Sequence, residues 1–363
     1  METSWAPYME WSKARPAAWI DLAGSNLLGC TADDLPGARA ALEISGLNPD
    51  GYVPLLEAIA AKYGVSAARV ATAPGCSGAN FLAFAALVRP GDDVLVERPG
   101  YDPLLGALRM LGANIRRFER RWEERWAVDP DRIAAAMTPR TRLIVLTSPH
   151  NPTGVLIGDG PLDAVGALAA RADAHVLVDE VYLDAVYEER PAPAATRGEV
   201  FISTNSLTKA YGLSGLRAGW TLAAPAVTRA IRRARDVVDV IAPYPADQLA
   251  HLAFQHIHAL EARARALVQP NLDRLRGFVS ARRELEWVPP GGGTVAFPRL
   301  LGVSDTRDFA DQLMRDHHVA IVPGHFFDEP SHFRIAFGVA PGTFAAGLAA
   351  IDAALDARGT PPD

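Results

Sequence analysis

Short runs of β-branched and aliphatic residues alternate with amphipathic stretches from about residue 69 onward. Such runs, bounded by turn residues, are typical of strands, and the stretches between them have the spacing of helices. The runs that we expect to be strands are 69–73, 93–97, 142–147, 175–179, 200–204 and 218–222. This alternation predicts βαβ units and a mostly parallel sheet, in which ligands bind at the carboxyl ends of the strands.

The C-terminal part of the chain changes from this pattern to long helices and then to short strands. Residues 228–279 have the period of long helices, and we predict breaks at 242–245 and at Pro270, because proline lacks the N–H that a helix needs. Beyond them, we expect strands at 285–288, 294–297, 320–322 and 333–336, and helices at 305–317 and 342–356. The pattern predicts a small α+β unit after the main sheet.

The length and composition suit two packed domains. The chain has 363 residues, which is too long for a single ordinary hydrophobic core. Its composition, 49% hydrophobic and 21% charged, is that of a globular protein. We expect an N-terminal segment at 1–45 that joins the small domain, a large domain at 46–275 and a small C-terminal domain at 276–363. A net charge of −6 gives no basic surface for phosphate backbones, so we expect small-molecule ligands and no nucleic acid.

Cysteine content and hydropathy limit the cellular compartment, the metal sites and the membrane contacts that we expect for the protein. Cys30 and Cys76 are too few for a disulfide framework, and no Cys/His cluster has the spacing of a metal site. Residues 1–19 mix charges and prolines with aromatic residues, unlike a signal peptide. No uncharged apolar run approaches the roughly 20 residues of a spanning helix. We therefore expect a cytoplasmic protein with neither a metal nor a membrane partner.

A lysine among hydroxyl and glycine residues follows the strand expected at 200–204. Residues 205–220 are N-S-L-T-K-A-Y-G-L-S-G-L-R-A-G-W, with Lys209 among them. A primary amine there can form a Schiff base, and the nearby hydroxyls and Arg217 can bind a phosphate. On spacing alone, a solvated lysine in a Gly/Ser turn remains the alternative.

Two further segments end predicted strands with polar residues. Asp179 ends a buried apolar strand, where a carboxylate needs a cationic partner, unless it caps a helix beside a core residue, Tyr182. Asn151 lies in the segment 148–154, S-P-H-N-P-T-G, which by itself is an Asn-Pro turn. Both segments end where the predicted sheet would bind a ligand.

Two other places can bind an anion. The turn at 73–80 lies between a strand and a helix, where free N–H groups and the helix dipole favour a phosphate. Arg334 lies inside an otherwise apolar strand at 332–338, and a buried guanidinium demands an anion. A substrate carboxylate fits the fork of the guanidinium, with a structural salt bridge as the alternative.

Together these segments resemble the class I/II aminotransferases, enzymes of fold type I that use pyridoxal 5'-phosphate (PLP). S-L-T-K-x-x-G-L-x-G-L-R-x-G-W is similar to the family's PLP-lysine signature, and residues 148–154 and 97–101 are similar to its N-P-T-G loop and E-x-P-x-Y turn. The motifs follow the family's order from Gly75 to Arg334. The resemblance implies an α/β fold, with a mostly parallel seven-stranded sheet flanked by helices and a small α+β domain.

The resemblance also implies a role for each residue of the site. Lys209 would carry PLP and act as the catalytic base, while Asp179 holds the pyridinium nitrogen. Tyr101 would stack on the pyridine ring, and Arg334 would bind the substrate carboxylate near Asn151. The remaining cofactor contacts are the backbone of Cys76 and Ser77 and the side chains of Tyr182, Ser206, Thr208 and Arg217.

Two segments depart from the family. Members often have a tyrosine in an early Y-x-x-x-G segment that reaches the partner subunit's cofactor phosphate, and here Leu47 takes its place. Asn48 and Tyr52 are the candidate substitutes. Residues 24–26, G-S-N, lack the usual G-x-P pattern, so this wall of the substrate pocket has no assigned residue.

The motifs predict an aminotransferase that moves the amino group of an amino acid to a 2-oxo acid with ping-pong kinetics. A PLP-dependent lyase or cyclase is the main alternative, because the same carbanion can eliminate a substituent or cyclise. A non-catalytic PLP-binding regulator has less support, since no basic helix-turn-helix pattern precedes the early segment. An oxidoreductase is set aside for want of a G-x-G-x-x-G.

The sequence leaves the substrate side chain open. The family implies a homodimer, with active sites at the subunit interface. The aromatic candidates for a side-chain pocket are Trp5, Tyr8, Trp11, Trp19 and Phe326, each of which is more often plain core.

Overall fold

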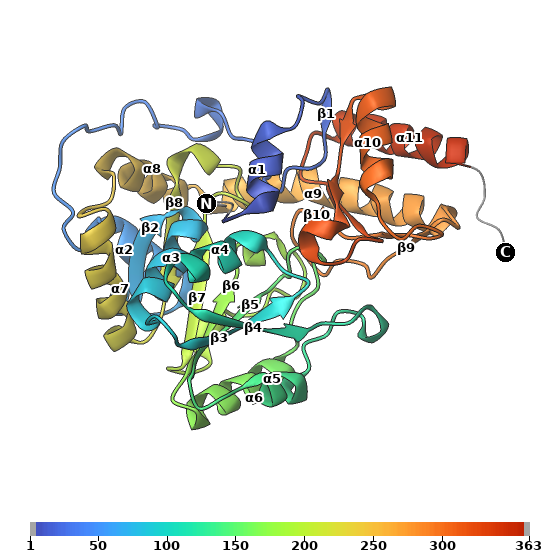
Figure 1. Ribbon diagram of the computed structural model, residues 1–363. Coiled ribbons are helices and arrows are strands. Elements are labelled where there is room, and N and C mark those ends of the chain that lie inside the picture. The colour runs from blue at the N-terminus through green and yellow to red at the C-terminus, as the bar shows by residue number, and fades with distance from the viewer. Residues whose placement is uncertain (1–4, 359–363) are drawn as a thin grey trace.

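The computed structural model describes residues 5–358 and contains one large sheet and several small ones (Figure 1). Residues 1–4 and 359–363, the ends of the expected terminal units, lie outside the described residues. The strands of the large sheet are β2 (Val70–Pro74), β3 (Asp93–Arg98), β4 (Asn114–Glu119), β5 (Thr141–Thr147), β6 (His175–Asp179), β7 (Phe201–Ser206) and β8 (Ala218–Leu222). The helices are α1 (Pro7–Ala14), α2 (Val53–Tyr63), α3 (Gly75–Leu87), α4 (Asp102–Met110), α5 (Pro130–Ala136), α6 (Asp159–Arg171), α7 (Pro225–Val238), α8 (Tyr244–Gln255), α9 (Ile257–Ala281), α10 (Arg307–His317) and α11 (Pro341–Arg358). None of the described helices is both long and apolar enough to cross a membrane.

The large sheet has the strand order β2-β8-β7-β6-β5-β3-β4, in which β8 runs antiparallel to both of its neighbours. The six predicted strands are confirmed to within two residues at each end. Strand β4 was not predicted from the sequence, because its residues N-I-R-R-F-E are largely polar. That composition suits its place at the edge of the sheet, where half of the strand meets water.

Helices cover both faces of this sheet, which explains why its central strands are continuous apolar runs. Successive residues alternate between the faces: Val94 and Val96 pack with α3, α4 and α7. Leu95 packs with α5 and α6 on the opposite face, as does Ile144 of β5. Since β3, β5, β6 and β7 are parallel, their carboxyl ends meet at one edge of the sheet.

Long helices connect the large sheet to the C-terminal part of the chain (Figure 1). The break predicted at 242–245 is confirmed, because the chain leaves the helix after α7 and resumes it at α8. The break predicted at Pro270 is wrong, since this proline lies inside the 25-residue α9. Buried Val268 and Leu272 and the bond from Asn271 to the carbonyl of Phe337 (2.9 Å) hold the helix in place and outweigh the cost of about 3 kcal/mol.

The C-terminal part is a small α+β unit, as predicted. Its strands are β9 (Leu285–Glu286), β10 (Val295–Ala296), β11 (Arg299–Leu300), β12 (Val319–Ala320), β13 (Val322–Pro323) and β14 (Phe333–Ala336). The N-terminal β1 (Ile20–Asp21) pairs with β12, and Leu22 and Leu27 pack into a core formed by α9, α10 and α11. Residues near the N-terminus therefore lie against this unit and beside β14.

Candidate active site

A cavity of about 320 Å³ opens at the carboxyl edge of the large sheet. All of the predicted cofactor contacts line it, although they come from segments far apart in the sequence. The full lining is Met9, Ser25, Asn26, Cys76, Ser77, Tyr101, Thr147, Pro149, Asn151, Asp179, Val181, Tyr182, Ser206, Thr208, Lys209 and Arg217. Arg334 lies next to this lining, because its Nη1 donates to Asn151 Oδ1 at 3.0 Å.

Lys209 follows β7 in a turn and presents its amine to the cavity. Its Nζ donates to Ser25 Oγ at 2.7 Å and to Asn26 Oδ1 at 2.6 Å. Burial, and then the charge of Arg334, lower the pKa of Lys209 to about 7. A large share of this amine is therefore unprotonated near neutral pH, as a nucleophile or base must be.

Asp179 ends β6 and lines the cavity. Its carboxylate accepts hydrogen bonds from Asn80 Nδ2 (2.7 Å), Cys76 Sγ (3.3 Å) and the backbone N–H of Val181 (3.1 Å). Burial raises its pKa despite these bonds. No side chain among residues 5–358 forms an ion pair with it, so a cationic group in the cavity would stabilise it.

Asn80 is a residue that the sequence analysis missed. It donates to Asp179 while its own Oδ1 accepts a hydrogen bond from Thr204 Oγ1 at 2.6 Å, so the carboxylate has one orientation. A signal was present, since Asn80 is the only amide within α3 and lies one turn after Cys76. The thiol of Cys76 points toward Asp179, and burial raises its pKa well above the ordinary value, so it is no nucleophile.

The part of the lining formed by Cys76, Ser77 and Arg217 has the features of an anion site. Helix α3 begins at Gly75 without a side-chain cap, which leaves the first N–H groups of the helix free at Cys76 and Ser77. The backbone packs tightly here: a Cβ on Gly219 would lie 2.3 Å from the backbone of Gly75. A Cβ on Gly75 would lie 2.4 Å from Nη2 of Arg217, so this guanidinium is held over the helix start.

Two buried hydroxyl groups in the lining have no hydrogen-bond partner among the described residues. They are the phenol of Tyr182, whose pKa burial raises to about 12, and Thr208 Oγ1. Ser206 is buried beside Thr208, and Tyr101 also lines the cavity. Unpartnered buried hydroxyls are costly unless a ligand completes them, so this lining fits a phosphorylated aromatic cofactor with its own polar oxygen.

Arg334, on β14, is fully buried. Its Nη2 donates to Tyr8 Oη and to the carbonyl of Ala23 at 2.9 Å, and its plane lies over the ring of Tyr8 at 4.9 Å. Its Nε has no partner, and no carboxylate of residues 5–358 pairs with it. The arrangement supports a carboxylate ligand over the alternative of a structural salt bridge.

A buried chain of polar groups supports the Asn151 loop and was also missed. Arg120 pairs with Glu97 at 3.0 Å, and Glu97 Oε1 accepts hydrogen bonds from the Thr147 N–H (2.7 Å) and hydroxyl (2.6 Å). The hydroxyl of Thr147 then accepts the N–H of Asn151 at 3.3 Å. The glutamate of the E-x-P-x-Y turn therefore fixes the loop that contacts Arg334.

The structure also places the residues that depart from the family. Leu47 is 90% exposed, and Asn48 is buried with its amide bonded to Asp247 Oδ2 (2.9 Å), so Asn48 has a partner in its own chain. Tyr52 packs against Tyr244. Among the aromatic candidates, Tyr8 supports Arg334, whereas Trp19 is 80% exposed and stacks on His318 away from the cavity lining.

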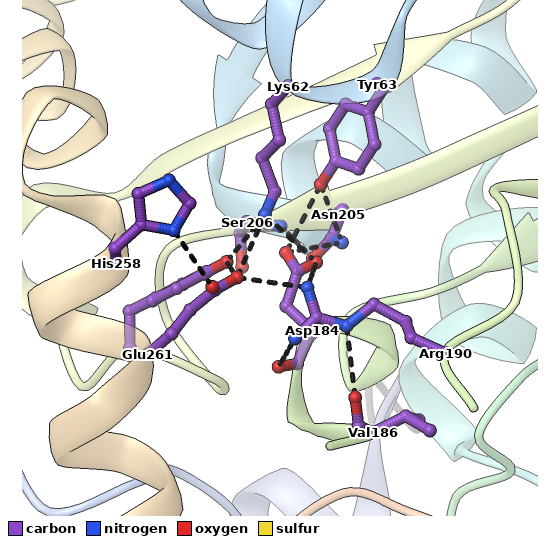
Figure 2. A network of polar contacts seen from close by, with 10 residues as sticks. Lys62, Tyr63, Asp184, Val186, Arg190, Asn205, Ser206, His258 and Glu261 are labelled. Atoms are coloured by element: carbon purple, nitrogen blue, oxygen red, sulfur yellow. Dashed lines mark hydrogen bonds and ion pairs between the residues drawn. The ribbon is translucent and has the colours of Figure 1, made fainter. Parts of the chain in front are cut away.

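A second, partly buried cluster of charged residues surrounds Asp184 (Figure 2). Asp184 contacts Lys62 (3.4 Å) and Arg190 (3.5 Å), and Glu261 contacts the same two cations at 3.3 and 3.0 Å. Asn205 of β7, four residues before Lys209 in the sequence, donates a hydrogen bond to Asp184. We call these four charged residues the closed cluster, and we call Asp179, Lys209 and Arg334 the open cluster.

Comparison with known proteins agrees with this geometry. Residues 44–351 match the family described as aminotransferase class I and II. A capreomycidine synthase of Streptomyces vinaceus is 33% identical over 297 residues, which cover 79% of this chain and 74% of that protein. A PLP-dependent aminotransferase from Streptococcus suis has a solved structure with a TM-score of 0.93 and 25% identity, covering 99% of this chain and all of the other. The PLP-dependent cyclase OrfR has a TM-score of 0.86 and 28% identity, covering 97% of both chains.

The chain therefore belongs to the class I and II aminotransferase family and has the α/β fold of these enzymes. It is a PLP-dependent enzyme of that family.

Proposed function

We propose that this protein is an aminotransferase that moves the amino group of an amino acid to a 2-oxo acid by a ping-pong mechanism. The observation that supports it most directly is the open cluster. A carboxylate without a counterion and an amine with a pKa near 7 line one cavity, and a cation without a counterion lies next to its lining, bonded to Asn151. These are the three groups that an amino-acid substrate on PLP requires.

In this proposal each end of the cavity holds a different part of the ligands. Cys76, Ser77, Ser206, Thr208 and Arg217 hold the phosphate of PLP. Tyr101 stacks on its ring, Tyr182 donates to its phenolic oxygen, and Asp179 keeps its ring nitrogen protonated. PLP, when bound, supplies an electron sink for the pair left at the substrate Cα.

The substrate is bound and deprotonated by three residues of the chain. Arg334 grips the α-carboxylate beside Asn151, which places the Cα–H bond near Lys209 Nζ. Lys209 takes the Cα proton and returns it on the cofactor side, because its lowered pKa makes it competent as both base and acid near neutral pH.

The experiment separates the two half-reactions. Purified protein loaded with PLP is mixed with single amino acids and no acceptor, and the visible absorption band is followed. A donor should bleach the band with one equivalent of 2-oxo acid formed, and a 2-oxo acid should restore it. Continuous turnover without an acceptor would contradict the proposal.

A PLP-dependent lyase or cyclase is the second candidate, favoured by the similarity to a capreomycidine synthase and to the cyclase OrfR. The residues of the site would act in the same way up to removal of the Cα proton. Mass spectrometry of the same incubations distinguishes the outcomes. Pyruvate with ammonia identifies a lyase, and a cyclic amino acid formed without any 2-oxo acid identifies a cyclase.

We further propose a homodimer, formed through an apolar surface patch beside the loop that holds Leu47. The patch is defined by exposed aliphatic side chains, and its members are Ile44, Leu47, Val237, Val238 and Val240. Contiguous exposed aliphatic groups of this kind mark interfaces. Leu47→Asp should shift the mass measured by light scattering from twice to once 38.8 kDa, and an unchanged mass would exclude this surface.

We also propose that the chain is divided into two domains and that the protein is cytoplasmic. Residues 46–275 would bind PLP, and residues 276–363 with 1–45 would form the small domain, with α9 shared by both because it is continuous through residue 275. The free thiols Cys30 and Cys76 support the cytoplasmic location that the sequence predicts.

A further inference from the structure

The wall formed by residues 24–26, which lacks the family's G-x-P pattern, contacts the amine of Lys209. Ser25 Oγ and Asn26 Oδ1 accept hydrogen bonds from Nζ at 2.7 and 2.6 Å. Both belong to the N-terminal segment, more than 180 residues before the lysine. Neither residue has a role in the function proposed above.

The backbone around these two residues is fixed on both sides. The N–H of Leu27 donates to the carbonyl of Lys209 at 3.2 Å. The hydroxyl of Thr294 donates to the carbonyl of Ser25 at 2.8 Å. The segment is therefore anchored to the Lys209 turn by its backbone, and this positions its two acceptors beside Nζ.

The two hydrogen bonds from Nζ to Ser25 and Asn26 fix the direction of the one tetrahedral position of this nitrogen that they do not use. A lysine nitrogen is tetrahedral, with one bond to Cε and three positions for protons or a lone pair. Oδ1 of Asn26 only accepts, and Oγ of Ser25 can accept a second N–H. One position is left, and it holds the lone pair of the amine or the third proton of the ammonium.

We infer that Ser25 and Asn26 form an amine clamp, which positions the nitrogen of Lys209 so that its one free position receives and returns the substrate proton. The inference rests on the proposed function and deepens it. When the Cα–H bond breaks, its proton binds to the lone pair of Nζ, and the resulting ammonium keeps two protons on the clamp. The proton on the free position is then the one returned, so Ser25 and Asn26 are positioning residues for the transfer.

The test needs only two components: the protein without its cofactor, and PLP that is added to it. The rate at which PLP attaches to Lys209 is measured by absorption from pH 5 to 10, and borohydride reduction with peptide mass analysis identifies the modified lysine. Attachment requires the neutral amine, so the rate rises as Lys209 loses its proton. The titratable groups that act on this amine are Arg334, Asp179, Cys76 and Arg217, and none of them is replaced in any of the variants.

The clamp stabilises the ammonium, because both acceptors bind its N–H groups. Ser25→Ala with Asn26→Ala should therefore move the half-maximal rate about one unit toward lower pH. Asn26→Asp should move it about one unit toward higher pH, since a carboxylate favours the ammonium. Ser25→Thr keeps the hydroxyl and should therefore keep the wild-type pH profile. Ser280→Ala, which replaces an exposed serine of α9, is the matched control.

The outcomes separate the inference from the function on which it rests. Attachment at Lys209 with the same pH profile in wild type, the Ala double variant and Asn26→Asp overturns the amine clamp and leaves the proposed function intact. Opposite shifts in the Ala and Asp variants support the clamp even if one of them folds poorly, because each profile is normalised to the PLP bound. Failure of wild-type Lys209 to bind PLP overturns both.

Discussion

The open and closed clusters lie on opposite faces of β7 and differ in how their charges are neutralised. Thr204 bonds to Asn80 beside Asp179, and Ser206 lines the cavity. Asn205, between them, faces Asp184 of the closed cluster (Figure 2). Both clusters contain a buried aspartate, Asp179 at 6% and Asp184 at 2% exposed. Asp184 has two cations within 3.5 Å, whereas Asp179 forms no ion pair with any of residues 5–358.

The difference shows how a fold separates stability from function. Charges that neutralise each other inside the protein hold elements together, here α2, α9 and the turn after β6. Charges left without a counterion cost free energy until a ligand supplies it. Two aspartates five residues apart therefore have opposite expected effects when they are replaced.

The largest effect is expected for Asp179→Asn. Because the amide cannot keep the ring nitrogen of PLP protonated, turnover should fall by about 10²- to 10³-fold. The free energy of unfolding should change by less than about 1 kcal/mol, since removing the cost of a buried carboxylate without an ion pair offsets the loss of a hydrogen bond to it. Steady-state kinetics with the best donor and urea denaturation measure the two quantities, and a large loss of stability would erase the distinction between the clusters.

Asp184→Asn is the matched replacement in the closed cluster. Lys62 and Arg190 would lose a shared counterion, so the free energy of unfolding should fall by about 2 kcal/mol, less than for fully buried pairs because both cations still touch water. PLP should still attach to Lys209. Urea denaturation of the cofactor-free protein checks this, and unchanged stability would contradict the structural role of the cluster.

Arg334→Met tests the cationic side of the open cluster. Removing the fork should weaken binding of carboxylate ligands by about 10- to 100-fold, because hydrogen bonds to a charged group are lost. Methionine fills much of the same volume between Tyr8 and Phe327, so stability should hold. Titration with a non-reactive carboxylate analogue gives the affinity, and an unchanged value would remove Arg334 from the substrate site.

The smallest effect is expected for Asn80→Ala. Asp179 would keep its contacts with Cys76 and Val181 but lose its shortest hydrogen bond, so turnover should fall by about threefold to tenfold. Asn80→Ser is a milder comparison, since it retains a donor. Equal activity in the wild type and both variants would show that Asn80 does not support Asp179.

Local sequence predicted the fold and the lining of the cavity well, because both depend on short segments. Strands buried on two faces are apolar runs, and the polar residues that end β6 and β7 belong to recognisable motifs. Errors occurred where tertiary packing overrode local preference, at the polar edge strand β4 and at Pro270. Neither the strand β4 nor the helix through Pro270 can be predicted from the residues of its own segment.

The pairing of charges could not be predicted in this way. Whether Asp179 or Asp184 has a cation depends on Lys62 in α2 and Arg190 beyond β6, which only the folded chain brings together. The contacts of Ser25 and Asn26 with Lys209 likewise join segments that are more than 180 residues apart in the sequence. Motifs name the residues of a site, and long-range packing decides how each is supported.

The most direct test of the account is the visible absorption spectrum of the protein with PLP, recorded for the wild type and for Lys209→Ala. We predict a band of lysine-bound PLP in the wild type that borohydride fixes to Lys209 and that is absent in the variant. The same band in Lys209→Ala, or no band in a folded wild type with excess PLP, would contradict the central claim.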